Sequence, residues 1–250
     1  MTPFRPYLLA FASVVCVPFA SADQHRPLSV TVEGGAASFT RNDVRIPNDG
    51  GTRYDMLNLT GEGPDPYARL YVHYAFNDRH SLRLNLAPLQ SSGTGEFAES
   101  VDFVDSTFAA DTPTRGSYRF NTYRLTYRWL FHQSERWDWG VGGALLVRDA
   151  KVELTQGDLN ALDDDVGVVP LLHLYGAYDL GDGWSLVLDV EGAGAPQGRA
   201  IDAALQAHYQ LDRHWSLAGG YRILDGGADN DSLYTFARVH YAHLAVGYRF

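Results

Sequence analysis

The chain is short of cysteine, lysine and long apolar runs. Cys16 is the one cysteine and Lys151 the one lysine among 250 residues. Cys16 lies in the first 22 residues, which have the pattern of a removable leader, so the mature chain is expected to contain no thiol. This excludes disulfide bridges and cysteine-based metal or catalytic sites. After the leader no apolar run approaches the ~18 residues of a membrane helix, so a membrane-bound form must cross with strands.

The first residues are organised as a secretory signal peptide. Arg5 precedes an apolar stretch over residues 7–19, which the small residues 20–22 follow. This pattern predicts cleavage after Ala22 and leaves residues 23–250 as the mature chain. The formal net charge of −10 argues against a nucleic-acid partner, because such proteins carry basic surfaces.

Segments of about ten residues that alternate in polarity recur along the mature chain. Tight polar turns are expected near residues 77–80, 133–136, 181–183 and 212–214, and long extracellular loops near residues 41–66, 91–116 and 155–167. Tight connections at one end and long ones at the other are typical of outer-membrane barrels. The pattern predicts an all-β fold, a closed antiparallel up-and-down transmembrane β-barrel of ten strands, with eight as the alternative. The expected strands are residues 28–40, 67–76, 81–89, 118–131, 137–154, 168–180, 184–193, 200–210, 215–224 and 234–250.

Aromatic residues indicate which face of these strands meets lipid. A soluble periplasmic barrel would distribute them through its core, whereas rings at one level around a cylinder suit a lipid–water interface. Tyr118, Phe120, Tyr234 and Phe236 are expected to form the second such girdle, at the loop end. The girdle at the tight-turn end is predicted to consist of Phe76, Phe131, Trp137, Trp139, Trp184, Tyr209, Trp215, Tyr248 and Phe250.

The opposite face of the strands carries charges of both signs and is expected to line the lumen. Unpaired ions in a narrow interior would be costly, so these side chains are predicted to pair with one another. Such a network either closes the barrel or lines a pathway that attracts anions. Its expected members are Glu33, Arg69, Arg83, Arg124, Arg128, Asp189, Glu191, Asp202 and Arg222.

Together, the signal peptide, the strand pattern and the C-terminal "LAVGYRF" resemble the small single-chain class of bacterial outer-membrane β-barrels over essentially the whole mature chain. The resemblance implies a Gram-negative outer membrane and contact with its lipids, including lipopolysaccharide. It also implies that the barrel-assembly machinery recognises Tyr248 and Phe250. No motif assigns a subfamily.

A non-enzymatic role is favoured: a structural or surface protein, or a porin-like barrel that passes small solutes, without a cofactor. The alternative is a membrane-embedded hydrolase. The weak catalytic candidates His214 and Ser216, like His80 and Ser81, resemble the His-x-Ser pattern of outer-membrane lipid A deacylases. Both pairs follow tight turns, at the periplasmic end, and no glutamate lies at a suitable distance after Ser216. Omptin-like proteolysis needs Asp and His at the outer rim, where these loops have almost no His.

The expected outer loops are acidic. Clustered carboxylates bind Ca²⁺ or Mg²⁺ through oxygen ligands, but these spacings fit no EF-hand. Solvation of the loops explains the charges as well, so a divalent-cation site stays open as an alternative. The residues concerned are Glu96, Glu99, Asp102, Asp105, Asp111, Asp163, Asp164, Asp165, Asp225, Asp229 and Asp231.

Overall fold

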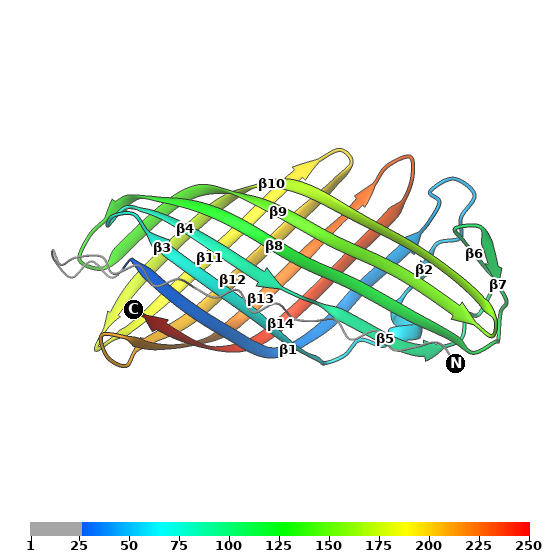
Figure 1. The fold of residues 1–250 in the computed structure, drawn as a ribbon, viewed down its shortest axis with the longest axis horizontal. Helices are drawn as coiled ribbons and strands as arrows, with labels where there is room; N and C mark the ends of the chain where they lie inside the picture. The colour runs from blue at the N-terminus through cyan, green and yellow to red at the C-terminus, as the bar shows by residue number, and fades with distance from the viewer. Residues whose placement is uncertain (1–26) are drawn as a thin grey trace, which may run out of the picture.

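The computed structural model describes residues 27–250, which form a closed antiparallel β-barrel of ten strands, as the strand pattern predicts (Figure 1). The expected signal peptide, residues 1–22, lies outside the described residues. Within residues 27–250 no helix is long and apolar enough to cross a membrane. The barrel strands are β1 (Leu28–Arg45), β3 (Asp65–Ala75), β4 (His80–Ala87), β8 (Thr114–Gln133), β9 (Trp137–Gln156), β10 (Leu159–Gly181), β11 (Trp184–Ala195), β12 (Gly198–Gln210), β13 (Trp215–Asp229) and β14 (Tyr234–Arg249).

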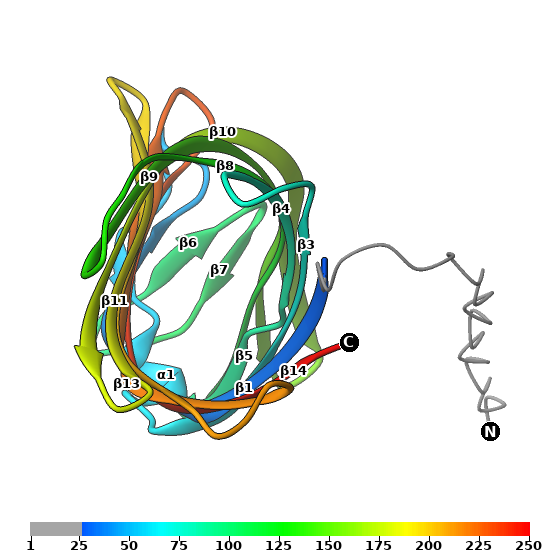
Figure 2. The same ribbon diagram turned by 90° about the vertical axis from the view of Figure 1, so that its left-hand side faces the viewer.

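The first and last strands close the barrel. β1 pairs with β14 from Ser29 opposite Arg249 to Arg45 opposite Tyr234, with one register shift after Phe39. Otherwise each barrel strand pairs with its neighbours in the chain, so the wall is a series of hairpins around one axis (Figure 2). Closure hydrogen-bonds the two edge strands to each other. Lipid offers no partners for the backbone N–H and C=O groups of an open edge.

Strict alternation of burial in β14 shows how the sequence sets the two faces. Val239, Tyr241, His243 and Ala245 are buried, whereas Ala242, Leu244 and Val246, which alternate with them, are exposed. In a barrel of this kind the inward face meets other side chains and the outward face meets the surroundings. The exposed leucines and valines of the wall therefore mark a lipid-facing surface.

Two long connections fold over one end of the barrel instead of projecting from it. The connection after β1 contains β2 (Tyr54–Asp55) and α1 (Leu57–Thr60), and the connection after β4 contains β5 (Gln90–Gly95), β6 (Val101–Phe103) and β7 (Ser106–Phe108). β5 extends the wall by pairing with β8. Met56, Phe103 and Phe108 are fully buried with inward side chains of the wall, so this apolar core fills part of the loop end.

Residues 155–167, expected as a long loop, are strand in the structure. β9 and β10 form one hairpin whose two-residue turn begins at Gly157, which has a φ of 58°. The acidic residues 163–165 predict a loop, because such residues usually occur in solvated connections. Here Asp165 forms an ion pair with Arg148 on β9 (2.5 Å), and Asp164 lies opposite Lys151. Cross-strand pairs of opposite charge suit a strand that continues into water.

The prediction for Tyr118 and Phe120 is also wrong, because both side chains point inward. Tyr118 is buried, stacks on Phe120 and contacts Phe39 edge-on, with ring centroids 6.0 Å apart. The two residues are an even number of positions from Arg124, so all three share the luminal face of β8. Tyr234 and Phe236, which the sequence predicts for the same girdle, do occupy outward positions at the loop end.

A glycine in the β1–β14 pairing that closes the barrel, which we call the closing seam, gives a test of barrel assembly. Gly35 on β1 lies opposite His243, and a Cβ at this position would collide with the Ala242 carbonyl oxygen of β14. We expect Gly35→Ala to lower the folded fraction, measured as the heat-modifiable band on unboiled gels. Its neighbour gives the control, since a Cβ at Gly34 would lie 3.6 Å from the Tyr67 carbonyl oxygen, an ordinary contact. Equal folding of the two variants would contradict the role given to this seam.

Candidate functional site

Ion pairs join opposite walls in the middle of the barrel interior. Asp202 on β12 forms ion pairs with Arg124 of β8 (Nη2, 2.6 Å), Arg222 of β13 (Nη1, 2.7 Å) and Arg69 of β3 (Nη1, 3.3 Å). Glu33 on β1 lies 3.3 Å from Arg222 Nη2 and 3.8 Å from Arg69 Nε. All five side chains are almost completely buried. The contacts therefore span the lumen rather than run along one strand.

A second group of ion pairs continues from the first. Arg83 on β4 donates to both oxygens of Asp189 (2.5 and 3.0 Å) and to Glu191 Oε1 (2.8 Å) on β11. Glu191 Oε2 accepts from Arg124 (2.9 Å), and Glu191 Oε1 also accepts from the Thr126 hydroxyl (2.6 Å). Arg124 thus joins the two groups into one network. We call it the luminal network; its charged members are Glu33, Arg69, Arg83, Arg124, Asp189, Glu191, Asp202 and Arg222.

Formal charge cancels within this network, which pairs four guanidiniums with four carboxylates. Arginine suits it because the planar fork satisfies several oxygens at once and stays charged when buried. Removing one member would leave an uncompensated buried ion, which is strongly unfavourable. The network therefore forms a neutral, cross-linked partition inside the barrel.

Arg128, also expected in the lumen, lies apart from the network near the tight-turn end. Its guanidinium carbon lies 4.0 Å from the Tyr175 ring centroid, and its Nη2 lies 3.2 Å from His73 Nε2. Neutral luminal partners were missed in the sequence: Tyr67 donates to Glu33 (2.9 Å), and the Tyr71 hydroxyl accepts from Arg222 (2.9 Å). Tyr67 and Tyr71 lie two positions before and after Arg69 on β3, so the period of two predicts that they share its luminal face.

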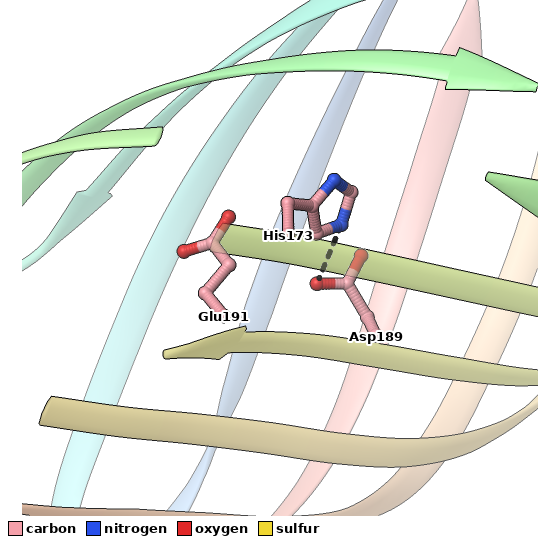
Figure 3. Close-up of side chains that lie close together, drawn as sticks. All are labelled: His173, Asp189 and Glu191. Carbon is pink, nitrogen blue, oxygen red and sulfur yellow. Dashed lines mark ion pairs between the residues drawn. The ribbon is translucent and has the colours of Figure 1, made fainter. Parts of the chain in front are cut away.

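His173, Asp189 and Glu191 bring metal-ligand atoms together at the edge of the network (Figure 3). His173 on β10 lies opposite Glu191 on β11, and its Nε2 is 3.4 Å from Asp189 Oδ1. Nitrogen and carboxylate ligands of this kind bind zinc and related ions. Arg83 already donates to both carboxylates, so a metal ion would have to displace the Arg83 guanidinium. The geometry favours an ion-paired role for the two acids.

Two cavities lie on either side of the luminal network. The one at the tight-turn end has a volume of about 750 Å³ and is lined by polar residues such as His73, Gln210 and Arg249. The other has a volume of about 610 Å³, and Arg124 and Asp202 form its floor. Its inner walls are largely apolar and include Phe120, Leu146, Leu171, Ala193, Ala200, Leu224 and Ala237. We call this second space the loop-end cavity.

The wall beside the loop-end cavity is incomplete. β10 and β11 pair only as far as Leu172 opposite Gly192, whereas residues 159–171 of β10 continue to pair with β9. In Figure 1 the β11–β12 hairpin diverges from β10 in this region. Proline lacks an N–H and suits a strand with a free edge, as at Pro170. The cavity is lined by inward Val169 and also by outward Val168, so its lining includes side chains from both faces of the wall.

Charged residues form the rim of the loop-end cavity beyond this opening. Arg148, Lys151, Asp163 and Asp165 line it on β9 and β10. Partial burial, and then the neighbouring Asp165 and Asp164, raise the pKa of Asp163 above its ordinary value. The acidic run therefore borders the cavity mouth. Within residues 27–250 the carboxylates of the acidic segments do not gather in threes, as an all-carboxylate cation site would require.

The predicted girdle residues lie at the tight-turn end, where several rings pack in pairs. Ring centroids are 5.5 Å apart for Trp137 and Trp139, 4.7 Å apart for Trp184 and Tyr209, and 4.8 Å apart for Trp215 and Tyr248. Phe76, Phe131 and Phe250 are exposed at the same end. Aromatic rings at one level are typical of a lipid–water interface.

Neither His–Ser pair is assembled for catalysis. The His214 ring stacks on outward-facing Tyr248, with centroids 5.7 Å apart, whereas Ser216 lies beside Gly247 on the inner face. His80 contacts the Tyr127 hydroxyl (2.6 Å), while Ser81 is buried in the wall. Each histidine and its serine thus face different sides of the barrel.

Comparison with known proteins finds the same fold among solved structures. No protein-family profile matches the chain, and no curated protein matches its sequence. The outer-membrane protease OmpT from Escherichia coli matches with a TM-score of 0.53 and 10% identity, over 90% of this chain and 97% of that one. The chain shares the closed β-barrel fold of this outer-membrane protein. The likeness extends to fold alone, because so few residues are identical.

Weaker likenesses are found to other outer-membrane barrels. AlkL, solved in lipid bilayers, matches with a TM-score of 0.44 and 13% identity, over 94% of this chain and 97% of that one. Ail, the attachment invasion locus protein of Yersinia pestis, matches with a TM-score of 0.39 and 12% identity, over 89% and 98%. These matches carry no argument about function.

Asp202→Asn tests the network. Removing this carboxylate leaves Arg69, Arg124 and Arg222 with excess buried positive charge, so we expect the free energy of unfolding to fall by about 3–5 kcal/mol. The measurement is urea unfolding in phospholipid vesicles, followed by tryptophan fluorescence. Asp165→Asn is the control: its single, partly exposed pair with Arg148 should contribute no more than about 1 kcal/mol. A similar loss for both variants would contradict the central role of Asp202.

Proposed function

We propose that this barrel admits small, mainly apolar molecules into the loop-end cavity through the opening between β10 and β11, without forming a continuous aqueous channel. The observation that carries the proposal is the end of the β10–β11 ladder at Leu172 and Gly192 beside a cavity lined by both inward and outward side chains. A gap of this kind connects the cavity to the lipid side of the wall.

The height of the opening supports access from the membrane. Tyr178 lies opposite Trp137 at the aromatic level, and Leu172 is six positions further along β10. With a rise of about 3.4 Å per residue and a tilt of about 40°, the opening begins about 15 Å from that level, within an apolar band of about 25 Å. Outward Val166 and Val168, 67% and 64% exposed, continue the apolar surface along the free edge. An apolar molecule dissolved among lipid chains can reach the opening without crossing water.

The lining of the cavity supports an apolar ligand rather than an ion. A volume of about 610 Å³ falls in the usual range for small-molecule sites. Leu146, Leu171 and Leu224 provide apolar surface, whose burial favours binding of hydrocarbon groups. Arg124 and Asp202 at the floor neutralise each other (2.6 Å), so the floor presents no net charge to attract an ion.

Neither the hydrolase alternative nor an open porin gains support from these contacts. The His–Ser pairs belong to the tight-turn end, on the far side of the luminal network from this cavity. The network itself lies between the two cavities and cross-links β1, β3, β4, β8, β11, β12 and β13. Passage sideways needs no rearrangement of these ion pairs, whereas passage along the axis does.

Single-cysteine labelling tests the cavity directly, because a chain expressed from Asp23 contains no cysteine. Ala200→Cys, inside the cavity, is labelled with a fluorophore and titrated in lipid nanodiscs with TEMPO benzoate, a small apolar nitroxide that quenches fluorescence. We expect saturable quenching, since the cavity holds a limited number of molecules. Leu205→Cys, on the lipid-facing side of the same strand, should show quenching that rises linearly as the nitroxide partitions into lipid.

A blocking substitution separates binding from partitioning in the same assay. Ala193→Trp places a large ring in the cavity beside the opening, so the saturable component at position 200 should disappear while heat-modifiability is retained. Saturation that persists in the folded variant would count against this entry route.

In planar bilayers the protein should produce no stepwise conductance, because passage along the axis would require the ion pairs of the luminal network to rearrange. Reproducible channel steps from the folded wild-type protein would instead establish an axial pore and overturn the sideways route as the principal path. A purified porin reconstituted in parallel verifies that the bilayer reports open channels.

A further inference from the structure

Outward-facing arginines gather on the outer wall at the loop end, over β12, β14 and β1. Arg238 on β14 lies opposite Arg41 on β1 and opposite Asp225 on β13, and Asp225 lies opposite Ile201, two positions from Arg199 on β12. Four adjacent strands thus present charged side chains at one level. We call this surface the arginine cluster; it consists of Arg41, Arg45, Arg53, Arg199 and Arg238.

Burial of the neighbouring positions shows that the cluster faces outward. Arg238 lies between buried Ala237 and Val239, and Arg41 and Arg45 flank buried Asn42 and Val44. The cluster is therefore separate from the luminal network, and its guanidiniums are accessible from the membrane side. The side chains of Arg199, Arg238 and Arg53 are 40%, 43% and 52% exposed.

Carboxylates compensate only part of this positive charge. Asp225 accepts from the Nε atoms of Arg199 and Arg238 (2.5 Å each), and Asp43 accepts from Arg41 (2.7 Å) and Arg53 (2.9 Å). Asp225 and Asp43 thus each serve two guanidiniums, and Asp229 is contacted by Asn48 (2.9 Å). Within the described part of the chain, the Nη atoms of Arg199 and Arg238 make no hydrogen bond. Donors remain available for an anion.

The height of the cluster corresponds to one edge of the membrane. Arg199, Asp225 and Arg238 each lie ten positions from the aromatic residue of the same strand at the tight-turn end: Tyr209, Trp215 and Tyr248. Ten residues in tilted strands span about 25 Å, which is the height of the apolar band of an outer-membrane barrel. The cluster therefore lies at the second lipid–water boundary, where lipid head groups are found.

Aromatic rings support the same placement. Guanidinium carbons lie 5.0 Å (Arg41) and 5.1 Å (Arg199) from the Phe236 ring centroid, and Arg53 lies 4.5 Å from that of Tyr234. Tyrosine and phenylalanine at this level mark the interface, and their faces hold the guanidiniums in position. The arginines are thereby ordered on the wall rather than extended into solvent.

We propose that the arginine cluster binds the phosphate groups of a lipid anchored in the outer leaflet, the chemistry that lipopolysaccharide presents in its lipid anchor. Guanidinium forks match phosphate oxygens and form charge-assisted hydrogen bonds. A lipid head group is held at this boundary by its own acyl chains, which pack against the apolar wall below the cluster, whereas free phosphate lacks that contribution. The proposal does not depend on which ligand occupies the loop-end cavity, although Arg199 and Asp225 also line that cavity.

Native mass spectrometry of the folded full barrel in detergent tests the assignment with three purified lipid A forms as probes: diphosphorylated, monophosphorylated and phosphate-free. We expect affinity to fall in that order. Arg199→Gln/Arg238→Gln should weaken binding of the diphosphorylated form about tenfold or more, because two phosphate-binding side chains are removed. Arg199→Gln alone serves if the double variant fails to show heat-modifiable folding.

The matched control is Arg115→Gln/Arg119→Gln, which alters two outward arginines at the loop end of β8, away from the cluster. It should leave the affinity unchanged. Asp225→Asn should tighten binding, because it releases two guanidiniums from a competing carboxylate; a purely structural role for the cluster predicts no such gain. Equal loss in cluster and control variants, or equal affinity for phosphate-free lipid A, would overturn the proposal. Displacement by millimolar inorganic phosphate would assign the cluster to free phosphate instead.

Discussion

Charge neutrality inside the barrel is the constraint on which the rest of this structure depends. Unpaired ions in a narrow lumen are costly, so each guanidinium of the luminal network pairs with a carboxylate from another strand. Asp202 meets this need for Arg69, Arg124 and Arg222, and Arg124 extends the pairing to Glu191. The ion pairs cross-link the wall, divide the interior into two cavities and give the loop-end cavity a floor without net charge.

Unequal strand lengths leave the β9–β10 hairpin with a free edge beside the loop-end cavity. β9 and β10 extend together to a turn at Gly157, whereas β11 and β12 turn back earlier, after Ala195. The longer hairpin is left with one free edge, and the cavity opens beside it. On the other side of the mouth the Met56 and Phe103 core fills the end of the barrel. The proposed sideways access depends on this asymmetry.

Alternation along the strands made most of the barrel predictable, because lipid and lumen impose opposite requirements on successive side chains. The ten strands, the aromatic level at the tight turns and the luminal position of residues such as Glu33 all follow from it. Predictions were wrong where the type of residue was given more weight than the alternation. The acidic residues Asp163–Asp165 suggested a loop, and the aromatic character of Tyr118 suggested a girdle despite its parity with Arg124.

The sequence by itself determined which side chains face lipid and which face the lumen, because a period of two leaves each strand residue only two directions. Only the tertiary structure decided which charges meet, where the β10–β11 ladder ends, and that Arg41, Arg199 and Arg238 lie together on the outer wall. Those relations depend on stagger between strands and on the closure of β1 against β14, which bring residues about 200 positions apart into contact. No local pattern contains that information, because register is set by the wall as a whole.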